Sequence, residues 1–434
     1  MISQKQTGSS RTSRLMRTTF APLRVRNFGL LFGGQMFSTI GDMFYAVALP
    51  WLMLSSGRTP QELGIVLAAY GVPRVATILL GGLLSDRLRP RRVMLLSDLM
   101  RALLLSVLVG LTASGQTAVL PLAAVSAPLG AFTGLFLPAY YSILPEVLSE
   151  EELPAGNALN SSAFQLAVLL GSALAGVVVS RLQPVAALSV DAVTFVISAL
   201  TLFAMRGLPG RRGAQALEKK GELTRAGAPE TGVASRFEAS ISIWQLVRQW
   251  RLLHVGLVVM VSINLTIGAL FEIALPTLAR GPWHAGATGF GLLLAAFSLG
   301  ALAGGLVGGV AGRMRRRGLI MLSTILALAL FYPLVPFVGG LPGAMLVLAL
   351  AGSANGLLNV LFFTVTQQLT PPRLLGRVMS VLMLANVSVY PLSVALGGLL
   401  ITHFGTTVLF LATGALMALA SLFGWLQPEM RQLQ

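Results

Sequence analysis

Four acidic residues interrupt long apolar stretches of the chain, and they are the side chains best suited to charge chemistry. They are Asp42, Asp98, Asp191 and Glu272. A charged group in apolar surroundings costs free energy and is usually paired or functional. A carboxyl group that alternates between such surroundings and water, or gains and loses a neighbouring cation, can take up and release a proton. The pattern therefore indicates proton or cation handling.

Other kinds of chemistry find no support in the residues. The chain has no cysteine, which excludes disulfides, thiol catalysis and cysteine-ligated metals. Its three histidines, His254, His284 and His403, are far apart, and no metal-ligand spacing or catalytic motif accompanies them. We therefore expect no enzyme activity, no metal site and no cofactor.

The composition is that of a protein that crosses a membrane many times. Of the 434 residues, 55% are hydrophobic and 11% are charged, whereas soluble domains carry roughly 25% charged residues. The mean hydropathy is +0.79. The net charge of +16 comes from arginines in short loops between apolar spans, which indicates membrane topology and not binding of nucleic acid.

Twelve apolar stretches each have the ~20 residues that a spanning helix needs. They are Phe28–Met53, Leu63–Leu84, Val93–Ala113, Ala118–Tyr140, Ala158–Ser180, Val185–Met205, Leu252–Ala279, Gly289–Gly312, Leu319–Val338, Gly343–Val365, Val378–Thr402 and Thr407–Leu426. Helices are expected because open strands would leave backbone groups unpaired in lipid. The first apolar stretch lacks a small-residue cleavage signal, so we interpret it as a retained helix.

The basic residues predict the orientation of these spans. With the N-terminus in the cytoplasm, nearly all Lys and Arg fall on the cytoplasmic side, and the opposite loops hold only Arg58, Arg181 and Arg280. An excess of basic residues marks cytoplasmic loops. We therefore predict a multi-pass protein of a bacterial-type cell membrane with both termini inside.

The two halves of the chain repeat. Ala48-Leu-Pro50 matches Ala274-Leu-Pro276, and Gly81-Gly-Leu83 matches Gly304-Gly-Leu306 at a nearly equal spacing. Such duplication typically places a binding site between the halves, near the middle of the membrane. The predicted organisation is a basic tail, a six-helix bundle, a cytoplasmic linker, a second six-helix bundle and a short tail, at residues 1–27, 28–205, 206–251, 252–427 and 428–434.

The stretch between the second and third spans resembles the cytoplasmic signature of the major facilitator superfamily. That signature is a glycine, spacers, Asp-Arg and a basic pair, and its positions here are Gly82, Asp86, Arg87, Arg91 and Arg92. With twelve spans, a long central loop and the half repeat, the resemblance extends over nearly the whole chain. It implies an all-α polytopic fold of two pseudo-symmetric six-helix bundles.

Further details are similar to the drug:proton antiporter branch that includes macrolide-efflux proteins and the enterobactin exporter. They are Gly41-Asp42, Ala48-Leu-Pro50 and Ser97-Asp98-Leu-Met-Arg101. The chain departs from this branch in lacking an arginine in the fourth span and a clear Gly-Pro-rich motif in the fifth. The second-half signature also lacks its acid, since Gly309 stands where Asp86 stands in the first half.

The resemblance implies roles for the charged residues. Loop residues of the signature would form a latch that docks on the other half, and we group Asp98 and Arg101 with them, although their spacing of one helical turn also suits a structural ion pair. The alternative for the arginines is that they only fix the orientation of the chain in the membrane.

Asp42 and Glu272, on equivalent spans that face the central cavity in this fold, are the proton-coupling candidates, with Arg74 as a partner. Permanent pairing with Arg74 is the alternative. Asp191, near the end of its span, is expected to reach water.

Spans one, four, seven and ten supply the candidates for the cavity wall, which are Gln35, Tyr45, Phe132, Asn264, Asn355 and Asn359. A mostly apolar wall with a few polar groups suits an amphipathic ligand. Hydrogen bonds between helices are the alternative for the asparagines, and Phe362 and Phe363 are interpreted as packing.

The predicted function is secondary export of a hydrophobic or amphipathic small molecule, drug-, macrolide- or siderophore-like, by proton antiport with alternating access. The expected partners are the substrate, protons and the lipid bilayer, with a monomeric chain. The alternatives are a lipid or lysolipid transporter on the same fold and a non-transporting membrane sensor.

Overall fold

The computed structural model describes residues 21–87, 89–149, 151–206, 251–311, 317–370 and 372–427. Most of the predicted linker, the tail 428–434 and most of the N-terminal tail lie outside the described residues. The side chains of residues 79–87 and 251–255 are outside them as well, so the latch candidates Gly82, Asp86 and Arg87 are described only as backbone at the end of a helix.

The described part of the first half consists of helices joined by short turns. Its elements are η1 (Ala21–Arg24), α2 (Arg26–Ser55), α3 (Pro60–Arg87), α4 (Pro90–Ala113), α5 (Val119–Val147) and α6 (Leu153–Ala204). The long α6 contains the fifth and sixth predicted spans, which are separated by a kink at Gln183 with φ 68° and ψ 165°. Pro184 follows, and a proline disfavours helical conformation in the residue before it.

The second half is built in the same way. Its elements are α10 (Arg251–Ala269), η2 (Leu270–Ala274), α11 (Leu275–Arg280), α12 (Gly286–Ala311), α13 (Arg317–Leu334), η3 (Val335–Phe337), α14 (Leu341–Leu369), α15 (Pro372–Ser388), α16 (Tyr390–Phe404) and α17 (Thr406–Trp425). Two predicted spans are not continuous α-helices. The seventh contains the π-helical turn η2, and the eleventh is broken at Val389 into α15 and α16.

The all-helical, membrane-spanning character predicted from the sequence is confirmed. Among the described residues, ten helices are long and apolar enough to cross a membrane, with α6 counted once and α3 not among them. Large apolar side chains such as Leu120, Phe203 and Leu306 are exposed, as expected for a protein whose surface faces lipid. The count of twelve spans stays a prediction.

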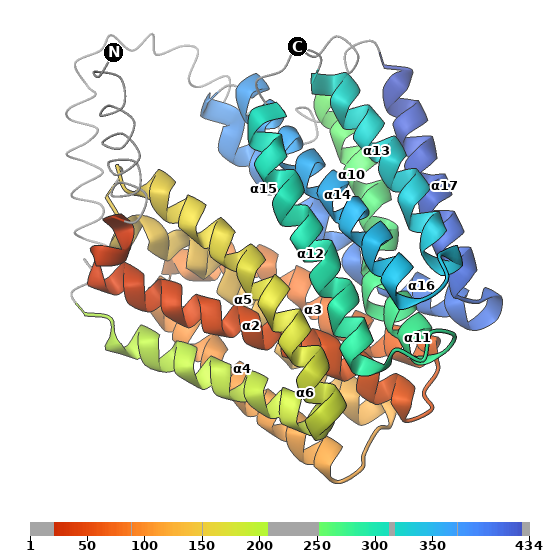
Figure 1. The fold of residues 1–434 in the computed structure, drawn as a ribbon. Helices are drawn as coiled ribbons and strands as arrows, with labels where there is room; N and C mark the ends of the chain where they lie inside the picture. Colours follow the sequence, from red (N-terminus) through yellow and green to blue (C-terminus); the bar gives the residue numbers. More distant parts are fainter. Residues whose placement is uncertain are drawn as a thin grey trace, which may run out of the picture.

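Figure 1 shows α2–α6 gathered on one side and α10–α17 on the other. The halves meet mainly along two contacts, where α6 packs on α12 and α3 packs on α16, and smaller contacts join α2 to η2, α11 and α12 and join α3 to η2 and α15. Both contacts lie toward the ends of the helices that the sequence predicts to be on the outer side of the membrane.

Glycine makes both contacts close. A Cβ atom added to Gly176 on α6 would lie 2.8 Å from the carbonyl oxygen of Ala287 on α12. A Cβ atom added to Gly64 on α3 would lie 2.6 Å from the carbonyl oxygen of Val394 on α16. The obstacles are backbone atoms, so no side-chain movement would make room. Small residues let the two halves approach to backbone contact.

The turn before α3 is fixed by its own side chains. Glu62 accepts hydrogen bonds from the backbone N–H of Thr59, at 2.7 Å, and from its hydroxyl, while the hydroxyl accepts one from the N–H of Glu62. This reciprocal arrangement is a capping box. The backbone hydrogen bond from Thr59 lowers the pKa of the Glu62 carboxyl below its ordinary value. The Thr59 hydroxyl and Arg58 lower this pKa further, by smaller amounts.

Arg91, from the basic loop, stabilises the end of α6. Its Nε and a terminal nitrogen donate hydrogen bonds, each of 2.8 Å, to the carbonyl oxygens of Leu202 and Phe203. Those carbonyls belong to the last turn of a helix, where backbone acceptors lack partners and a positive charge is favourable. In this structure Arg91 therefore binds within its own half, whereas Arg92 is exposed.

Replacing Arg91 with alanine is expected to lower the free energy of unfolding by about 1–3 kcal/mol, because two hydrogen bonds from a charged donor are lost. Thermal unfolding of the detergent-solubilised protein measures this as a lower midpoint temperature. Arg92→Ala is the matched control, since its neighbouring, exposed side chain should cost no more than about 0.5 kcal/mol. Equal midpoints for the two variants would show that Arg91 does not cap α6.

Candidate functional site

A cavity of about 720 Å³ lies between the two halves, mostly against the second. The first half contributes α2 and α6, through Met43 and Phe164 among others, and the second contributes α10, η2, α12, α13, α14 and α15. Most of the wall is apolar and aromatic. Its polar residues are Gln165, Asn264, Glu272, Ser298, Asn355, Asn359, Thr366, Thr370 and Asn386. Among the residues that line this cavity, Glu272 is the one with an ionisable side chain.

The backbone around Glu272 explains how a carboxylate is presented on this wall. Glu272 lies in the centre of the π-helical turn η2, and Pro276 follows four residues later. A proline has no N–H, so the usual helical hydrogen bond to the carbonyl of Glu272 cannot form. The N–H of Leu275 bonds instead to the carbonyl of Leu270. Such π-turns widen a helix locally and are frequent at functional sites.

The carboxylate of Glu272 is held by a tyrosine. The hydroxyl of Tyr390, the first residue of α16, donates a hydrogen bond of 2.5 Å to Oε2 of Glu272. Arg74, on α3, lies close enough for its charge to act on Glu272, but no ion pair joins them among the described residues. The Nε of Arg74 is buried without a hydrogen-bond partner in the described part of the chain. Permanent pairing of Glu272 with Arg74 is therefore absent from this conformation.

The three asparagine candidates are all on the cavity wall. Their hydrogen bonds stay within a helix, from Asn264 to the carbonyl of Met260 at 2.8 Å, and from Asn359 to the backbone and side-chain oxygens of Asn355 at 3.0 and 2.9 Å. Hydrogen bonds between helices were the alternative role for these asparagines, and the bonds that the structure shows for them are within one helix instead. Phe362 also lines the wall, as does Phe363, although both were interpreted as packing.

The other three cavity candidates lie away from this wall. Gln35 donates a hydrogen bond of 3.3 Å to Thr39 within α2, and the hydroxyl of Tyr45 lies 3.4 Å from that of Ser126 on α5. Phe132 is half-buried on α5. None of the three residues lines the cavity described above.

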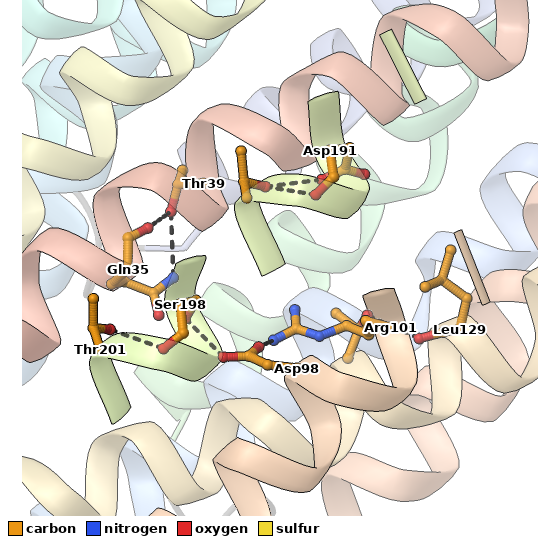
Figure 2. Close-up of polar contacts among 10 residues, drawn as sticks. Gln35, Thr39, Asp98, Arg101, Leu129, Asp191, Ser198 and Thr201 are labelled. Carbon is orange, nitrogen blue, oxygen red and sulfur yellow. Dashed lines mark hydrogen bonds and ion pairs between the residues drawn. The ribbon is translucent and has the colours of Figure 1, made fainter. Parts of the chain in front are cut away.

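Asp98 and Arg101 form a buried ion pair inside the first half. Asp98 also accepts a hydrogen bond of 2.7 Å from Ser198 on α6 (Figure 2). The guanidinium of Arg101 lies over the rings of Phe136 and Phe195, with its carbon 4.4 and 4.2 Å from their centres. The pair joins α4, α5 and α6 and is the ion pair expected from the spacing, an arrangement that favours a structural role over a role in the latch.

Replacing Asp98 with asparagine should destabilise the first half by about 3–5 kcal/mol, because Arg101 would keep a buried charge without a counter-ion. Thermal unfolding in detergent measures the effect. The control is Glu62→Gln, which removes one partner of the partly exposed pair with Arg58 and should cost only about 0–1 kcal/mol. An unfolding midpoint for Asp98→Asn close to that of the control would contradict the structural role.

The expectation that Asp191 reaches water is wrong. Asp191 is 1% exposed and lies on the face of α6 that packs against α2, with its Oδ1 3.5 Å from the hydroxyl of Thr194. A Cβ atom on Gly41 would lie 2.5 Å from that oxygen, so only glycine permits the approach. Asp191 lies two turns inside the helix that follows the kink at Gln183, and the close approach of α2 at Gly41 covers it.

Asp42 follows Gly41 on α2 and is half-buried. The positive charges of Arg101 and Arg74 favour the ionised form of Asp42, and the negative charge of Asp98 disfavours it. It forms no ion pair with either arginine among the described residues. Asp42 and Glu272 therefore occupy different surroundings, the first inside a bundle and the second on the cavity wall.

Tyr390 is the functional candidate that the sequence did not reveal. It lies 118 residues from Glu272 in sequence, and no local pattern connects the two. A partial signal was present in the eleventh span, where Tyr390-Pro391 interrupts an apolar run and predicts a break in the helix.

Comparison with known proteins agrees with this architecture. The family model of the Major Facilitator Superfamily matches residues 31–386 and 257–433. A multidrug efflux pump, Tap, of Mycolicibacterium fortuitum is 27% identical over 96% of this chain and 98% of its own length. The enterobactin exporter EntS of Citrobacter koseri is 25% identical over 86% of this chain and 85% of its own length.

Solved structures share the fold. A POT family transporter in complex with 5-aminolevulinic acid superposes with a TM-score of 0.71, at 14% identity, over 94% of this chain and 97% of the other. A D-xylose-proton symporter gives a TM-score of 0.69, at 15% identity, over 95% and 98% of the two chains. The family model and the full-length relatives, together with this fold, point to a membrane transporter and not to an enzyme. With the family model matched along nearly its entire length, the chain belongs to the Major Facilitator Superfamily.

Proposed function

We propose that this protein is a secondary transporter that exports hydrophobic or amphipathic small molecules, drug-, macrolide- or siderophore-like, by proton antiport. The observation that carries the proposal is the cavity between the halves, whose apolar wall holds one ionisable side chain, Glu272. Large apolar walls accept chemically varied ligands, while a few polar groups orient them. The efflux functions named for relatives at 25% and 27% identity favour export.

Glu272 is the leading candidate for proton coupling in this proposal. Its carboxylate can bind a proton from water in the cavity and lose it when the surroundings or the nearby charge of Arg74 change. Asp42 is a second candidate inside the first half, where Arg101 and Arg74 supply opposing charge. The signature residues Asp86, Arg87 and Arg92 are proposed to latch the halves in the opposite conformation.

In the proposed transport cycle the cavity opens alternately to the two sides of the membrane. The halves contact each other toward the predicted outer side, through the α3–α16 and α6–α12 contacts. The cavity wall continues along α14 to Thr370, toward the predicted cytoplasmic side. With the orientation predicted from the basic loops, this arrangement is open to the cytoplasm, the side from which an exporter loads.

The remaining organisation follows from the same orientation. We propose a monomer in a bacterial-type cell membrane, with bundles at 28–205 and 252–427, a cytoplasmic linker at 206–251 and both tails inside. Protons, the small-molecule substrate and the bilayer are its partners.

Purified protein in vesicles with an imposed pH gradient tests the proposal, with ethidium, a macrolide and a catecholate siderophore as probes. The expected result is gradient-dependent movement of at least one probe, abolished by a protonophore. Transport that requires ATP and ignores the gradient would overturn secondary transport. Flipping of a labelled lysolipid, with no movement of the three probes, would instead support the lipid alternative.

A further inference from the structure

Tyr390 occupies a position that joins the cavity to the contact between the halves. Its ring lies between two glycines that belong to different halves. A Cβ atom on Gly71 of α3 would lie 2.8 Å from Cδ1 of the ring, and one on Gly268 of α10 would lie 3.2 Å from Cδ2. The two edges of one ring therefore contact the first half and the second half, and glycine at both positions makes room for it.

The hydroxyl of the same side chain reaches the cavity carboxylate. Glu272 follows Gly268 by one helical turn, and its Oε2 accepts the 2.5 Å hydrogen bond from Tyr390. A tyrosine hydroxyl bonds strongly to an ionised carboxylate and less strongly to a protonated one. Protonation of Glu272, or its engagement by a bound cation, therefore changes the force that holds the ring in place.

The helix α16, which begins at Tyr390, forms the contact with α3 of the first half. Along α16, the carbonyl of Val394 faces Gly64 and the hydroxyl of Thr402 accepts a 2.9 Å hydrogen bond from the backbone N–H of Gln61. Because α16 is a continuous helix from Tyr390 to Phe404, a shift of its first turn moves the whole contact with α3.

Other charged or titratable groups near this site come from the first half. Arg74 on α3 acts electrostatically on both Glu272 and Tyr390, Tyr70 on α3 acts on Tyr390, and Glu272 itself acts on Tyr45 of α2. None of these three groups from the first half has a hydrogen bond to Glu272 among the described residues. Tyr390 is thus the side chain that physically connects the carboxylate to the interface.

We infer that Tyr390 is the positioning residue through which the protonation or occupancy of Glu272 controls the α3–α16 contact between the halves. The inference rests on the proposed transport function and adds the coupling element to it. Tyr390 keeps the ionised carboxylate oriented while the contact is closed. Loss of that hydrogen bond on protonation weakens the contact and permits the halves to part on the outer side.

The test uses thiol cross-linking, for which the natural absence of cysteine gives a clean background. Gln61→Cys and Thr402→Cys are introduced together, and their cross-linking rate by a short bifunctional thiol reagent is measured in vesicles at mildly acidic and mildly alkaline pH. Each rate is divided by the rate at which the two single-cysteine variants are labelled at the same pH, because the reactive thiolate fraction itself falls at acidic pH. Tyr390→Phe, which keeps the ring and removes the hydroxyl, is added to this pair. Tyr332→Phe is the matched control, because the hydroxyl of Tyr332 is buried without a hydrogen-bond partner in the described part of the chain.

The expected result is slower cross-linking at acidic pH in the parent pair and with Tyr332→Phe, by on the order of tenfold, the effect of one charge-assisted hydrogen bond on an equilibrium. With Tyr390→Phe the rate should become nearly independent of pH. Retention of the full pH dependence by Tyr390→Phe, or its absence in the parent pair, would overturn the inference. Gradient-driven ethidium movement by the chain without introduced cysteines reports separately on the proposed function.

Discussion

Replacing Glu272 with glutamine is expected to reduce gradient-driven export to the level of passive leak, at least on the order of tenfold below the unmodified protein. The amide keeps the shape of the side chain and can still accept the hydrogen bond from Tyr390. It cannot ionise, so it cannot exchange a proton or neutralise a cationic substrate. No other ionisable residue belongs to the described cavity wall, so none is available there to replace it.

Vesicles with an imposed pH gradient measure this effect, and the exchange of probe at equal pH on both sides is measured beside it. If only proton coupling is lost, probe exchange at equal pH stays intact. If the cavity has collapsed, both this exchange and gradient-driven transport are lost. Glu62→Gln is the matched control, because it removes a carboxyl outside the predicted spans. Full gradient-driven transport by Glu272→Gln would show that the proton is carried elsewhere, with Asp42→Asn as the next variant to measure.

Much of the fold was accessible from the sequence because the membrane restricts it so strongly. Apolar stretches of about 20 residues can only be helices in lipid, and the repeated Ala-Leu-Pro and Gly-Gly-Leu segments indicate duplicated halves. The acid at Asp98 and the arginine one turn later predicted an ion pair, which the structure contains. Each of these inferences depends on local spacing, which the sequence records directly.

The site was less accessible because its contacts are long-range. The hydrogen bond between Tyr390 and Glu272 joins helices far apart in the chain, and the burial of Asp191 depends on how closely α2 approaches α6 at Gly41. Pro276, four residues after Glu272, was a readable sign that the helix is irregular there. Which way the resulting π-turn directs the carboxylate depends on tertiary packing.

The glycine contacts between the halves lead to the second large prediction. Replacing Gly176 with valine should disfavour closure on the predicted outer side and strongly slow transport, because the added Cβ would lie 2.8 Å from the carbonyl of Ala287 and 3.0 Å from the Cα of Gly291. Overpacking of this kind costs about 1–3 kcal/mol. A bias of that size shifts a two-state equilibrium between conformations by about 5- to 150-fold.

Labelling of a single introduced cysteine measures the shift. Asn264→Cys places a thiol on the cavity wall, in a chain that has no other, and a membrane-impermeant maleimide is added to the outer face of intact cells. We expect Gly176→Val to raise the labelling rate about tenfold or more, within the range of population shift above.

Gly33→Val, on α2, is the matched control, because a Cβ at Gly33 meets nothing within 4 Å. This control should leave both labelling and transport unchanged. A folded Gly176→Val protein that labels slowly and transports normally would show that the α6–α12 contact does not close the outer side. The same protein with fast labelling and no transport would identify this contact as the outer gate, since the cavity would then be accessible but unable to close.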